Sequence, residues 1–314
     1  MSSSSTSSPT EEFTHYYAQD HALQKVSVSV IQRNNPAEED TGYWVIYIHG
    51  GAWRDPTVTL SSFDLTQSIL LKSTTVQEKK KISAFASIEY RLSPHPNFPQ
   101  DPHTTPTREL RRAQHPDHIH DVRAAITFLQ TEYGFGDRYI LIGHSCGATL
   151  AFQTVMDNLP GVNPDSDAMR LIKPKAIVGV EGIYDLRLLR DNYKRYDAYQ
   201  EFLTGAFGPD EDLWDVVSPA RASSSSSSSG IQRSWAEGKL VVLAHSVDDE
   251  LVDFAQVDAM YDGLKAWGGE GNERRVVTLR DLHGLHNEVW SAGEELARVI
   301  SVAVEELVRL DERS

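Results

Sequence analysis

Residues 139–150 read YILIGHSCGATL, an apolar run of strand length followed by a glycine-flanked serine and the start of a predicted helix. This strand–turn–helix context is the one in which the G-x-S-x-G nucleophile elbow occurs. Gly143 and Gly147 suit a turn that is too tight for side chains at the flanking positions, and such a turn presents Ser145 above the positive end of the helix. The pattern predicts that Ser145 is a nucleophile; the alternative is an ordinary helix N-cap serine.

Short apolar runs alternate with segments of helical period along most of the chain. Nearly continuous apolar runs are typical of parallel strands that are buried on both faces, and they occur at residues 44–48, 82–88, 139–142, 176–180 and 240–244. Two further strands are predicted, a half-exposed one at 25–31 and a short last one at 276–279. Apolar residues at helical spacing predict helices at 121–131, 148–156, 252–267 and 292–310.

This alternation predicts an α/β fold with a mostly parallel central sheet and helices on both faces, in one domain spanning residues 21–314. We expect the N-terminus, residues 1–20, to be disordered because it is rich in serine. Two insertions interrupt the pattern near residues 93–118 and 184–235. The second is predicted to be a helical insertion above the carboxyl edge of the sheet. It contains a serine run, Ser223–Ser229, which is expected to be a loop.

Composition narrows the class of protein. The chain has 314 residues, of which 40% are hydrophobic and 24% charged, so it can build a large core. A net charge of −15 without a basic cluster argues against nucleic-acid and anionic-membrane binding. No apolar run is long enough to span a membrane, and the N-terminus does not resemble a secretory signal. Cys146 is the only cysteine, which excludes an internal disulfide, and we expect a cytoplasmic protein.

A second glycine-containing turn follows the apolar run at 44–48. Its residues are His49, Gly50, Gly51, Ala52 and Trp53. Glycines at this place let backbone N–H groups point into open space, as an oxyanion hole for acyl transfer requires. The expected donors are the N–H groups of Gly51, Ala52 and Cys146. A purely structural turn is the alternative.

A serine nucleophile needs a general base, and the base needs an orienting carboxylate. In hydrolases with this elbow, the acid follows a late strand and the histidine follows the last strand. After the strand at 240–244 the chain offers three acids, Asp248, Asp249 and Glu250. After the last strand it offers two histidines, His283 and His286. Spacing alone does not choose within either set.

These motifs together resemble the α/β-hydrolase superfamily, especially its hormone-sensitive-lipase-like esterase branch. Residues 89–94 (EYRLSP) and 120–125 (HDVRAA) look like the YRL-x-P segment of that branch and its following helix. More narrowly, three segments look like the fungal kynurenine formamidase (arylformamidase) family: HGGAWRDP at 49–56, AHSVDDELV at 244–252 and GLHNEVW at 284–290. The resemblance covers most of residues 25–310 and includes the α/β-hydrolase fold.

The resemblance implies a catalytic triad of Ser145, Asp249 and His286. It implies hydrolysis of N-formyl-L-kynurenine to L-kynurenine and formate, through a formyl-serine intermediate, in tryptophan degradation. Formyl is the smallest acyl group, so we expect selectivity on the leaving-group side, with Trp53 as a candidate to stack on the arylamine. Four aromatic residues of the second insertion are expected to pack in the core instead: Tyr184, Tyr193, Phe207 and Trp214.

Two alternatives stay open. A carboxylesterase of the same branch, acting on short-chain esters, would share every catalytic residue. A catalytically inactive hydrolase fold that binds a ligand or partner would not need the intact triad. No cofactor and no metal are expected, and the remaining histidines, including His115, His118 and His120, are predicted to be solvated loop residues. The expected partner is a small-molecule substrate, with no nucleic acid and no membrane; a homodimer is compatible with this interpretation.

Overall fold

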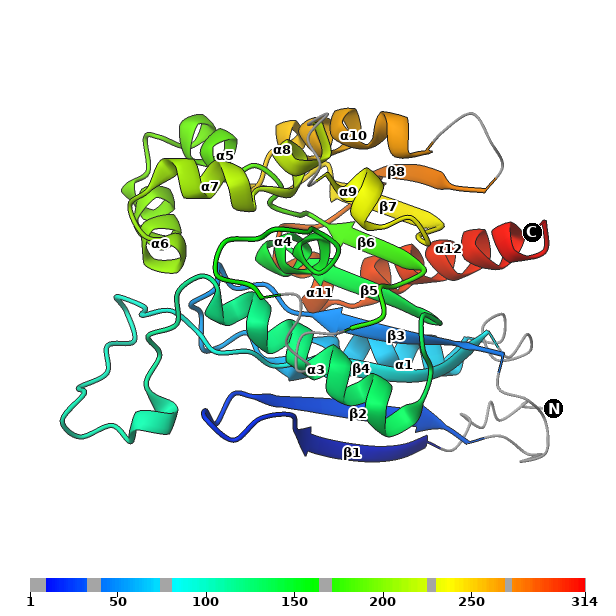
Figure 1. The fold of residues 1–314 in the computed structure, drawn as a ribbon, viewed down its shortest axis with the longest axis horizontal. Helices are drawn as coiled ribbons and strands as arrows, with labels where there is room; N and C mark the ends of the chain where they lie inside the picture. Colours follow the sequence, from blue (N-terminus) through cyan, green and yellow to red (C-terminus); the bar gives the residue numbers. More distant parts are fainter. Residues whose placement is uncertain are drawn as a thin grey trace.

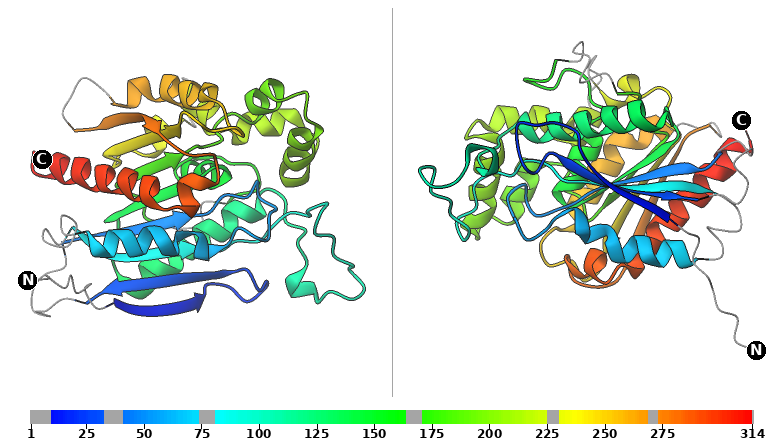
Figure 2. Two further views of the ribbon diagram at one scale, coloured as in Figure 1. Left: turned by 180° about the vertical axis from the view of Figure 1, so that it is seen from behind. Right: turned by 90° about the horizontal axis from the view of Figure 1, so that it is seen from below.

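The computed structural model describes residues 10–32, 41–73, 81–163, 171–224, 230–268 and 273–313. These residues form an eight-stranded sheet in the order β1-β2-β4-β3-β5-β6-β7-β8, with helices on both faces (Figures 1 and 2). β2 pairs with β1 and β4 in antiparallel fashion, and every other pair is parallel. The predicted α/β-hydrolase fold with a mostly parallel sheet is therefore confirmed.

Seven of the eight strands lie close to the predicted positions, and β1 is an addition. Their bounds are β1 Thr10–Tyr16, β2 Lys25–Ile31, β3 Tyr43–Ile48, β4 Ile82–Ile88, β5 Tyr139–His144, β6 Ala176–Val180, β7 Leu240–Ser246 and β8 Arg275–Leu282. All residues of β3 to β7 are buried, because successive side chains enter the cores on opposite faces. In β3, Trp44 and Ile46 pack in one core, and Val45 and Tyr47 pack in the other.

Helices cover the sheet on both sides, as the right panel of Figure 2 shows. One face carries α1 (Asp64–Lys72) and α12 (Glu294–Asp311). The other carries α3 (Asp117–Tyr133), α4 (Cys146–Gln153) and α10 (Phe254–Gly268). Within the described residues, no helix has both the length and the apolar character needed to cross a membrane.

The N-terminal segment differs from the prediction. Residues 1–9 lie outside the described residues, but Thr10–Tyr16 form β1, an edge strand, so the expectation of disorder over residues 1–20 is wrong from Thr10 onward. β1 pairs with β2 along its whole length, from Thr10 opposite Ile31 to Tyr16 opposite Lys25. Its mostly exposed side chains give little sequence signal, because the strand is held by backbone hydrogen bonds to its neighbour.

The second insertion is helical, as predicted. Its helices are α5 Leu186–Asn192, α6 Asp197–Phe207, α7 Glu211–Val217, α8 Pro219–Ser224 and α9 Ile231–Ser234. α5, α6 and α7 group together at one end of the molecule (Figure 1). The first two serines of the 223–229 run belong to α8, which corrects the expectation of a loop there; residues 225–229 lie outside the described residues.

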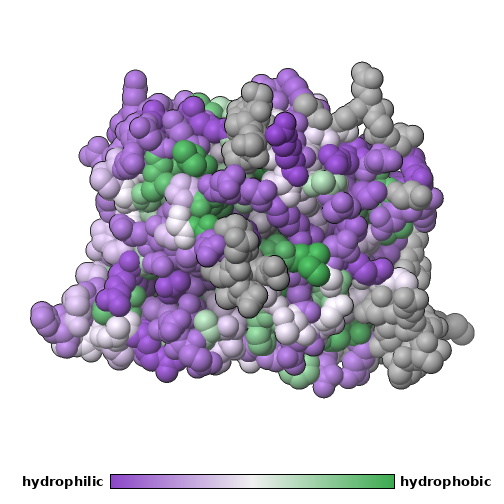
Figure 3. All heavy atoms as spheres, in the orientation of Figure 1, coloured by the Kyte–Doolittle hydropathy of each residue, from purple (hydrophilic) through white to green (hydrophobic). Residues whose placement is uncertain are grey.

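The first insertion runs as an extended loop with one short 3-10 helix, η2 (Thr107–Glu109), and joins α3 at Asp117. Figure 1 shows this loop projecting from the body of the molecule on the side where α6 lies. The face seen in Figure 3 is mostly hydrophilic with scattered apolar patches, consistent with the net charge of −15.

Candidate active site

Ser145 occupies a strained turn between β5 and α4. Its φ and ψ are 54° and −123°, a region that residues other than glycine seldom adopt, and its N–H donates to the Val180 carbonyl at 2.9 Å. Strain of this kind is concentrated at functional sites, because the surrounding structure must hold the residue in place. The conformation is that expected of a nucleophile elbow.

The two flanking glycines are required by close packing. A Cβ on Gly143 would lie 2.2 Å from the Gly147 carbonyl oxygen. A Cβ on Gly147 would lie 2.2 Å from the carbonyl oxygen of Ile48, at the end of β3. Any side chain at either position would therefore displace backbone atoms, and the sequence-based explanation for both glycines is confirmed.

Buried contacts of His49 with Glu89 and Tyr90 hold the HGGAW loop, His49–Trp53, in place. His49 Nε2 lies 3.3 Å from Glu89 Oε1, and the His49 ring stacks on Tyr90 at 4.4 Å between centroids. Gly51, Ala52 and Trp53 all have positive φ, of 94°, 49° and 60°. This unusual run turns the backbone sharply over the end of β3.

Three backbone N–H groups near Ser145 have no backbone acceptor in the described part of the chain, although that of Ala52 contacts the Cys146 thiol. Among the described residues, those of Gly51, Ala52 and Cys146 donate to no backbone oxygen. The Cys146 thiol lies beneath the loop and accepts a hydrogen bond from the Trp53 N–H at 3.3 Å. Burial raises the pKa of Cys146 to about 11, although hydrogen bonds from Tyr90 and from the loop backbone, including Ala52, oppose the shift. The thiol therefore stays protonated and is a poor nucleophile.

His286 and Asp249 form a buried pair. His286 Nδ1 lies 2.9 Å from Asp249 Oδ2. The other carboxylate oxygen, Oδ1, accepts the N–H groups of Leu251 and Val252, both at 2.9 Å. Asp249 is thus fixed by backbone donors on one side and orients the His286 ring on the other.

The competing acid and histidine form a different, exposed pair. His283 Nδ1 lies 3.4 Å from Asp248 Oδ2, and these side chains are 73% and 50% exposed. Asp248 also accepts the Gly284 N–H at 3.1 Å. This pair braces the loop after β8 at the surface, whereas Asp249 and His286 turn inward.

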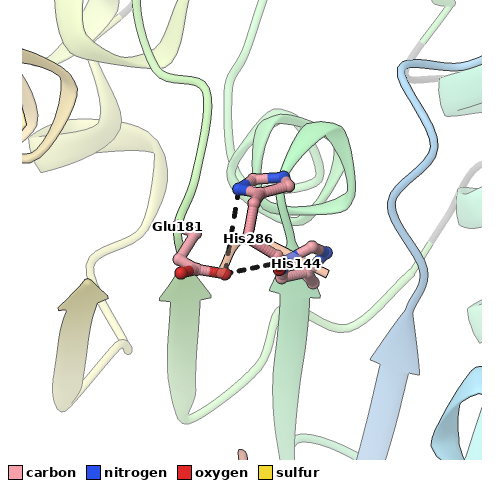
Figure 4. A group of neighbouring side chains, drawn as sticks. All are labelled: His144, Glu181 and His286. Atoms are coloured by element: carbon pink, nitrogen blue, oxygen red, sulfur yellow. Dashed lines mark hydrogen bonds and ion pairs between the residues drawn. The ribbon is translucent and has the colours of Figure 1, made fainter. Parts of the chain in front are cut away.

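A second buried carboxylate, Glu181 at the end of β6, lies beside this pair. Figure 4 shows Glu181 beside His144 and His286, with a contact to each. Glu181 Oε2 is 3.0 Å from His144 Nε2 and 3.8 Å from His286 Nδ1. These three residues offer metal-ligand atoms within 4.8 Å of one another, but a cation bound through His286 Nδ1 would displace Asp249. Nothing in the sequence pattern singled out Glu181.

The pKa of Glu181 is raised from its ordinary value of 4.5 to about 10, by burial first and then by the negative charges of Asp249 and Glu250. The folded protein therefore keeps a proton that the unfolded chain loses above pH 4.5, so this group destabilises the fold increasingly as pH rises toward 10.

Glu181→Gln should remove this dependence. We expect the variant to gain stability relative to the wild type between pH 6 and pH 9, by up to about 1.4 kcal/mol per pH unit. Urea unfolding of both proteins at several pH values measures the difference. If the free energy of unfolding depends on pH in the same way in both proteins, Glu181 is ionised in the folded protein.

One pocket brings the candidate residues together. Ser145, His286, Gly51 and Ala52 all line a cavity of about 260 Å³. Its apolar wall comes from the second insertion and from the loop after β7, through Leu189 on α5, Tyr199 and Phe202 on α6, and Leu251. The predicted insertion above the carboxyl edge of the sheet therefore forms part of the pocket.

Trp53 is placed differently from the prediction. It is fully buried, does not line the pocket, and packs edge-on against Phe207 with centroids 5.0 Å apart. The positive φ of Trp53 turns its side chain beneath the loop, so the aromatic wall is formed by Tyr199 and Phe202 instead. Three of the four insertion aromatics are buried in the core as expected, namely Tyr184, Phe207 and Trp214, and Tyr193 packs partly buried against it.

Several histidines predicted to be solvated are buried: His21, His49, His118, His144 and His245. Each ring has at least one nitrogen within hydrogen-bond distance of a polar atom, which offsets part of the water lost on burial. His118, for example, lies on α3 with Nε2 3.2 Å from Ser93 Oγ, and burial lowers its pKa to about 3. The His118 ring is therefore neutral, and composition does not reveal such a buried position.

Comparison with known proteins adds an independent finding. Residues 104–264 match the BD-FAE family. The chain is 40% identical over 281 residues to a kynurenine formamidase-like hydrolase of Fusarium equiseti, covering 90% of this chain and 89% of the relative. It is 38% identical over 269 residues to a kynurenine formamidase of Aspergillus versicolor, covering 80% and 85%.

Solved structures support the fold. A truncated carbohydrate esterase from gut microbiota superposes with a TM-score of 0.65 at 16% identity, covering 96% of this chain and 98% of the esterase. An esterase from Thermogutta terrifontis gives 0.62 at 14% identity, covering 95% and 94%. At such identities the likeness concerns the fold alone. Taken with the two fungal relatives, it shows that the chain belongs to the kynurenine formamidase family of α/β-hydrolases.

Proposed function

We propose that this chain hydrolyses N-formyl-L-kynurenine to formate and L-kynurenine, with Ser145, His286 and Asp249 as its catalytic triad. The observation that carries the proposal is that Ser145 and His286 line one pocket, while Asp249 holds His286 from behind at 2.9 Å. Membership of the family supports the choice of substrate, because the Aspergillus versicolor relative is named a kynurenine formamidase and the Fusarium equiseti relative a kynurenine formamidase-like hydrolase.

The acylation half-reaction follows from the roles of these groups. His286 Nε2 takes the proton of Ser145 Oγ while Oγ attacks the formyl carbon. The carbonyl oxygen becomes an oxyanion, which the N–H groups of Gly51, Ala52 and Cys146 stabilise; removing one such donor costs about 2.7–4 kcal/mol in well-studied cases. Asp249 stabilises the imidazolium, which then protonates the nitrogen of the departing arylamine as the C–N bond breaks.

Deacylation repeats the same steps with water. His286 removes a proton from a water molecule, and the hydroxide attacks the formyl-serine carbonyl. The tetrahedral intermediate collapses, Ser145 Oγ recovers its proton from His286, and formic acid leaves and ionises to formate in water. An arylamine is a weakly basic leaving group, so no step uses a metal.

The pocket wall suits an aromatic leaving group. Phe202 and Tyr199 present rings with centroids 5.4 Å apart, and both line the cavity together with Leu189 and Leu251. Flat aromatic substrates gain both apolar burial and favourable ring contacts against such a wall.

An acyl-chain series tests the substrate. A site specific for formyl must exclude larger acyl groups, and each extra methylene that has no room costs roughly 1–3 kcal/mol. We expect kcat/KM to fall steeply from N-formyl- to N-acetyl- to N-propionyl-kynurenine, measured by release of kynurenine. If the same preparation has a higher kcat/KM for p-nitrophenyl butyrate than for N-formyl-kynurenine, the protein is a carboxylesterase instead.

A further inference from the structure

Two charged residues that line the pocket, Arg54 and Asp55, have no part in the mechanism above, and Arg54 is the cation of the two. Arg54 follows the HGGAW loop directly and lines the same cavity as Ser145 and His286. Among the described residues that line this cavity, it is the only arginine or lysine. A permanent positive charge in a mostly apolar pocket is a strong recognition element for an anionic substrate group.

Arg54 is held in place but only partly paired. Its side chain is 12% exposed, with Nη1 2.8 Å from Glu201 Oε1, and its guanidinium lies 5.8 Å from the Phe202 ring centroid. Among the described residues, Nε and Nη2 have no acceptor. The planar fork of arginine binds a carboxylate through two N–H groups at once, so Arg54 has unused donor capacity beside the pocket.

The partner of Arg54 is replaceable. Glu201 lies on α6 with its side chain 53% exposed. Ion pairs with one partner largely in water contribute little to stability, because solvent screens the charge and the side chain must be ordered. A carboxylate on the substrate could therefore take the place of Glu201 with little loss of stability.

His95, from the first insertion, supplies a second donor. It lines the same pocket, and its Nδ1 accepts the Asn97 N–H at 3.1 Å, which leaves the ring proton on Nε2. Burial and the charge of Arg54 lower the pKa of His95, so the ring is a neutral N–H donor at pH 7. Through His95, the first insertion also forms part of the pocket lining.

We propose that Arg54, assisted by His95 Nε2–H, binds a carboxylate carried by the leaving-group part of the substrate, and that Glu201 occupies this position in the free protein. The substrate class is then aryl formamides whose amine portion carries a carboxylate. This inference rests on the proposed function, since the α-carboxylate of the kynurenine portion is such a group.

A structural clamp is the alternative role for this ion pair. If the pair only held α6 against the HGGAW loop, losing either partner would break the same contact and impair activity in the same direction. Under the proposal the two substitutions change activity on the carboxylate-bearing substrate in opposite directions. Removing Arg54 removes the group that binds the carboxylate, whereas removing Glu201 removes a competitor for Arg54.

The test compares Arg54→Gln and Glu201→Gln on two formamides, N-formyl-L-kynurenine and 2-formamidoacetophenone, which lacks the amino-acid portion. The readout is the ratio of kcat/KM for the first to kcat/KM for the second. Arg54→Gln should lower this ratio about 10- to 100-fold, mainly through KM, as expected for a charge-assisted hydrogen bond. Glu201→Gln should raise it about 2- to 5-fold. Arg298→Gln is the matched control, because Arg298 also pairs with a glutamate, Glu295, but does not line the pocket.

An equal loss on both formamides in both variants would overturn the proposal in favour of the structural clamp. An unchanged ratio in Arg54→Gln would also overturn it. If the wild type hydrolyses neither formamide, the proposed function fails, and the same variants are compared on 4-acetoxyphenylacetate and phenyl acetate. There, a ratio that falls in Arg54→Gln and rises in Glu201→Gln supports carboxylate recognition by itself, and an unchanged ratio rejects it.

Discussion

Ser145→Ala is expected to lower kcat by 10⁴-fold or more while leaving the fold intact. Without Oγ no formyl-serine can form, and triad losses of this kind leave only the residual effect of the oxyanion hole and binding. Alanine has the same Cβ as serine, so it meets the same backbone strain at φ 54° and introduces no new contact. Turnover of N-formyl-kynurenine and the thermal midpoint of unfolding measure the two effects.

Covalent labelling gives a second readout for the same residue. Phenylmethylsulfonyl fluoride should modify Ser145 and no other serine, as determined by peptide mass spectrometry of the wild-type protein. The neighbouring Cys146 should stay unmodified, because its buried thiol has a pKa of about 11. An active alanine variant, or labelling of a different serine, would refute the assignment of the nucleophile.

The second large effect separates the paired candidates for acid and base. Asp249→Asn and His286→Ala should each lower kcat by about 10⁴-fold, because the first leaves His286 in the wrong tautomer and the second removes the base. The matched controls are Asp248→Asn and His283→Ala, which alter an exposed pair that lies at the surface. Each control should cost less than about 10-fold.

The four variants are compared by kcat on one substrate, with circular dichroism to confirm folding. Losses of 10⁴-fold in Asp248→Asn or His283→Ala would reverse the assignment of both residues and leave the fold unaffected. Similar losses in all four variants would indicate that the loops after β7 and β8 act as one unit, in which the exposed pair holds the buried one in position.

Family resemblance pointed to Asp249 and His286, which form the buried pair in the structure, whereas pattern and spacing alone did not choose them. Asp248 and Asp249 are adjacent and chemically equivalent, and only the turn after β7 directs one to the surface and the other toward His286. That orientation depends on backbone N–H groups of Leu251 and Val252 that clamp Asp249. Such contacts cannot be obtained from composition or periodicity.

The pocket wall was harder to predict than the site itself. Tyr199 and Phe202 lie on a helix far along the chain from the elbow, and whether such residues face a cavity or the core depends on how α6 docks. Trp53 shows the converse, because its position beside the oxyanion loop suggested a substrate contact, whereas its backbone conformation buries it. The contact of Glu181 with His144 likewise depends on the pairing of β6 with β5, which the sequence pattern did not reveal.

The sequence by itself determined seven of the eight strands, several of the helices and the position of Ser145, but neither β1 nor α1. These are local properties: buried strands need continuous apolar runs, and the turn needs Gly143 and Gly147, where a Cβ would collide with backbone. Only the tertiary structure decided which acid and histidine meet, which aromatics line the pocket, and that Arg54 is the cation beside it. These features join segments distant in sequence, so they exist only after the sheet and its insertions have packed.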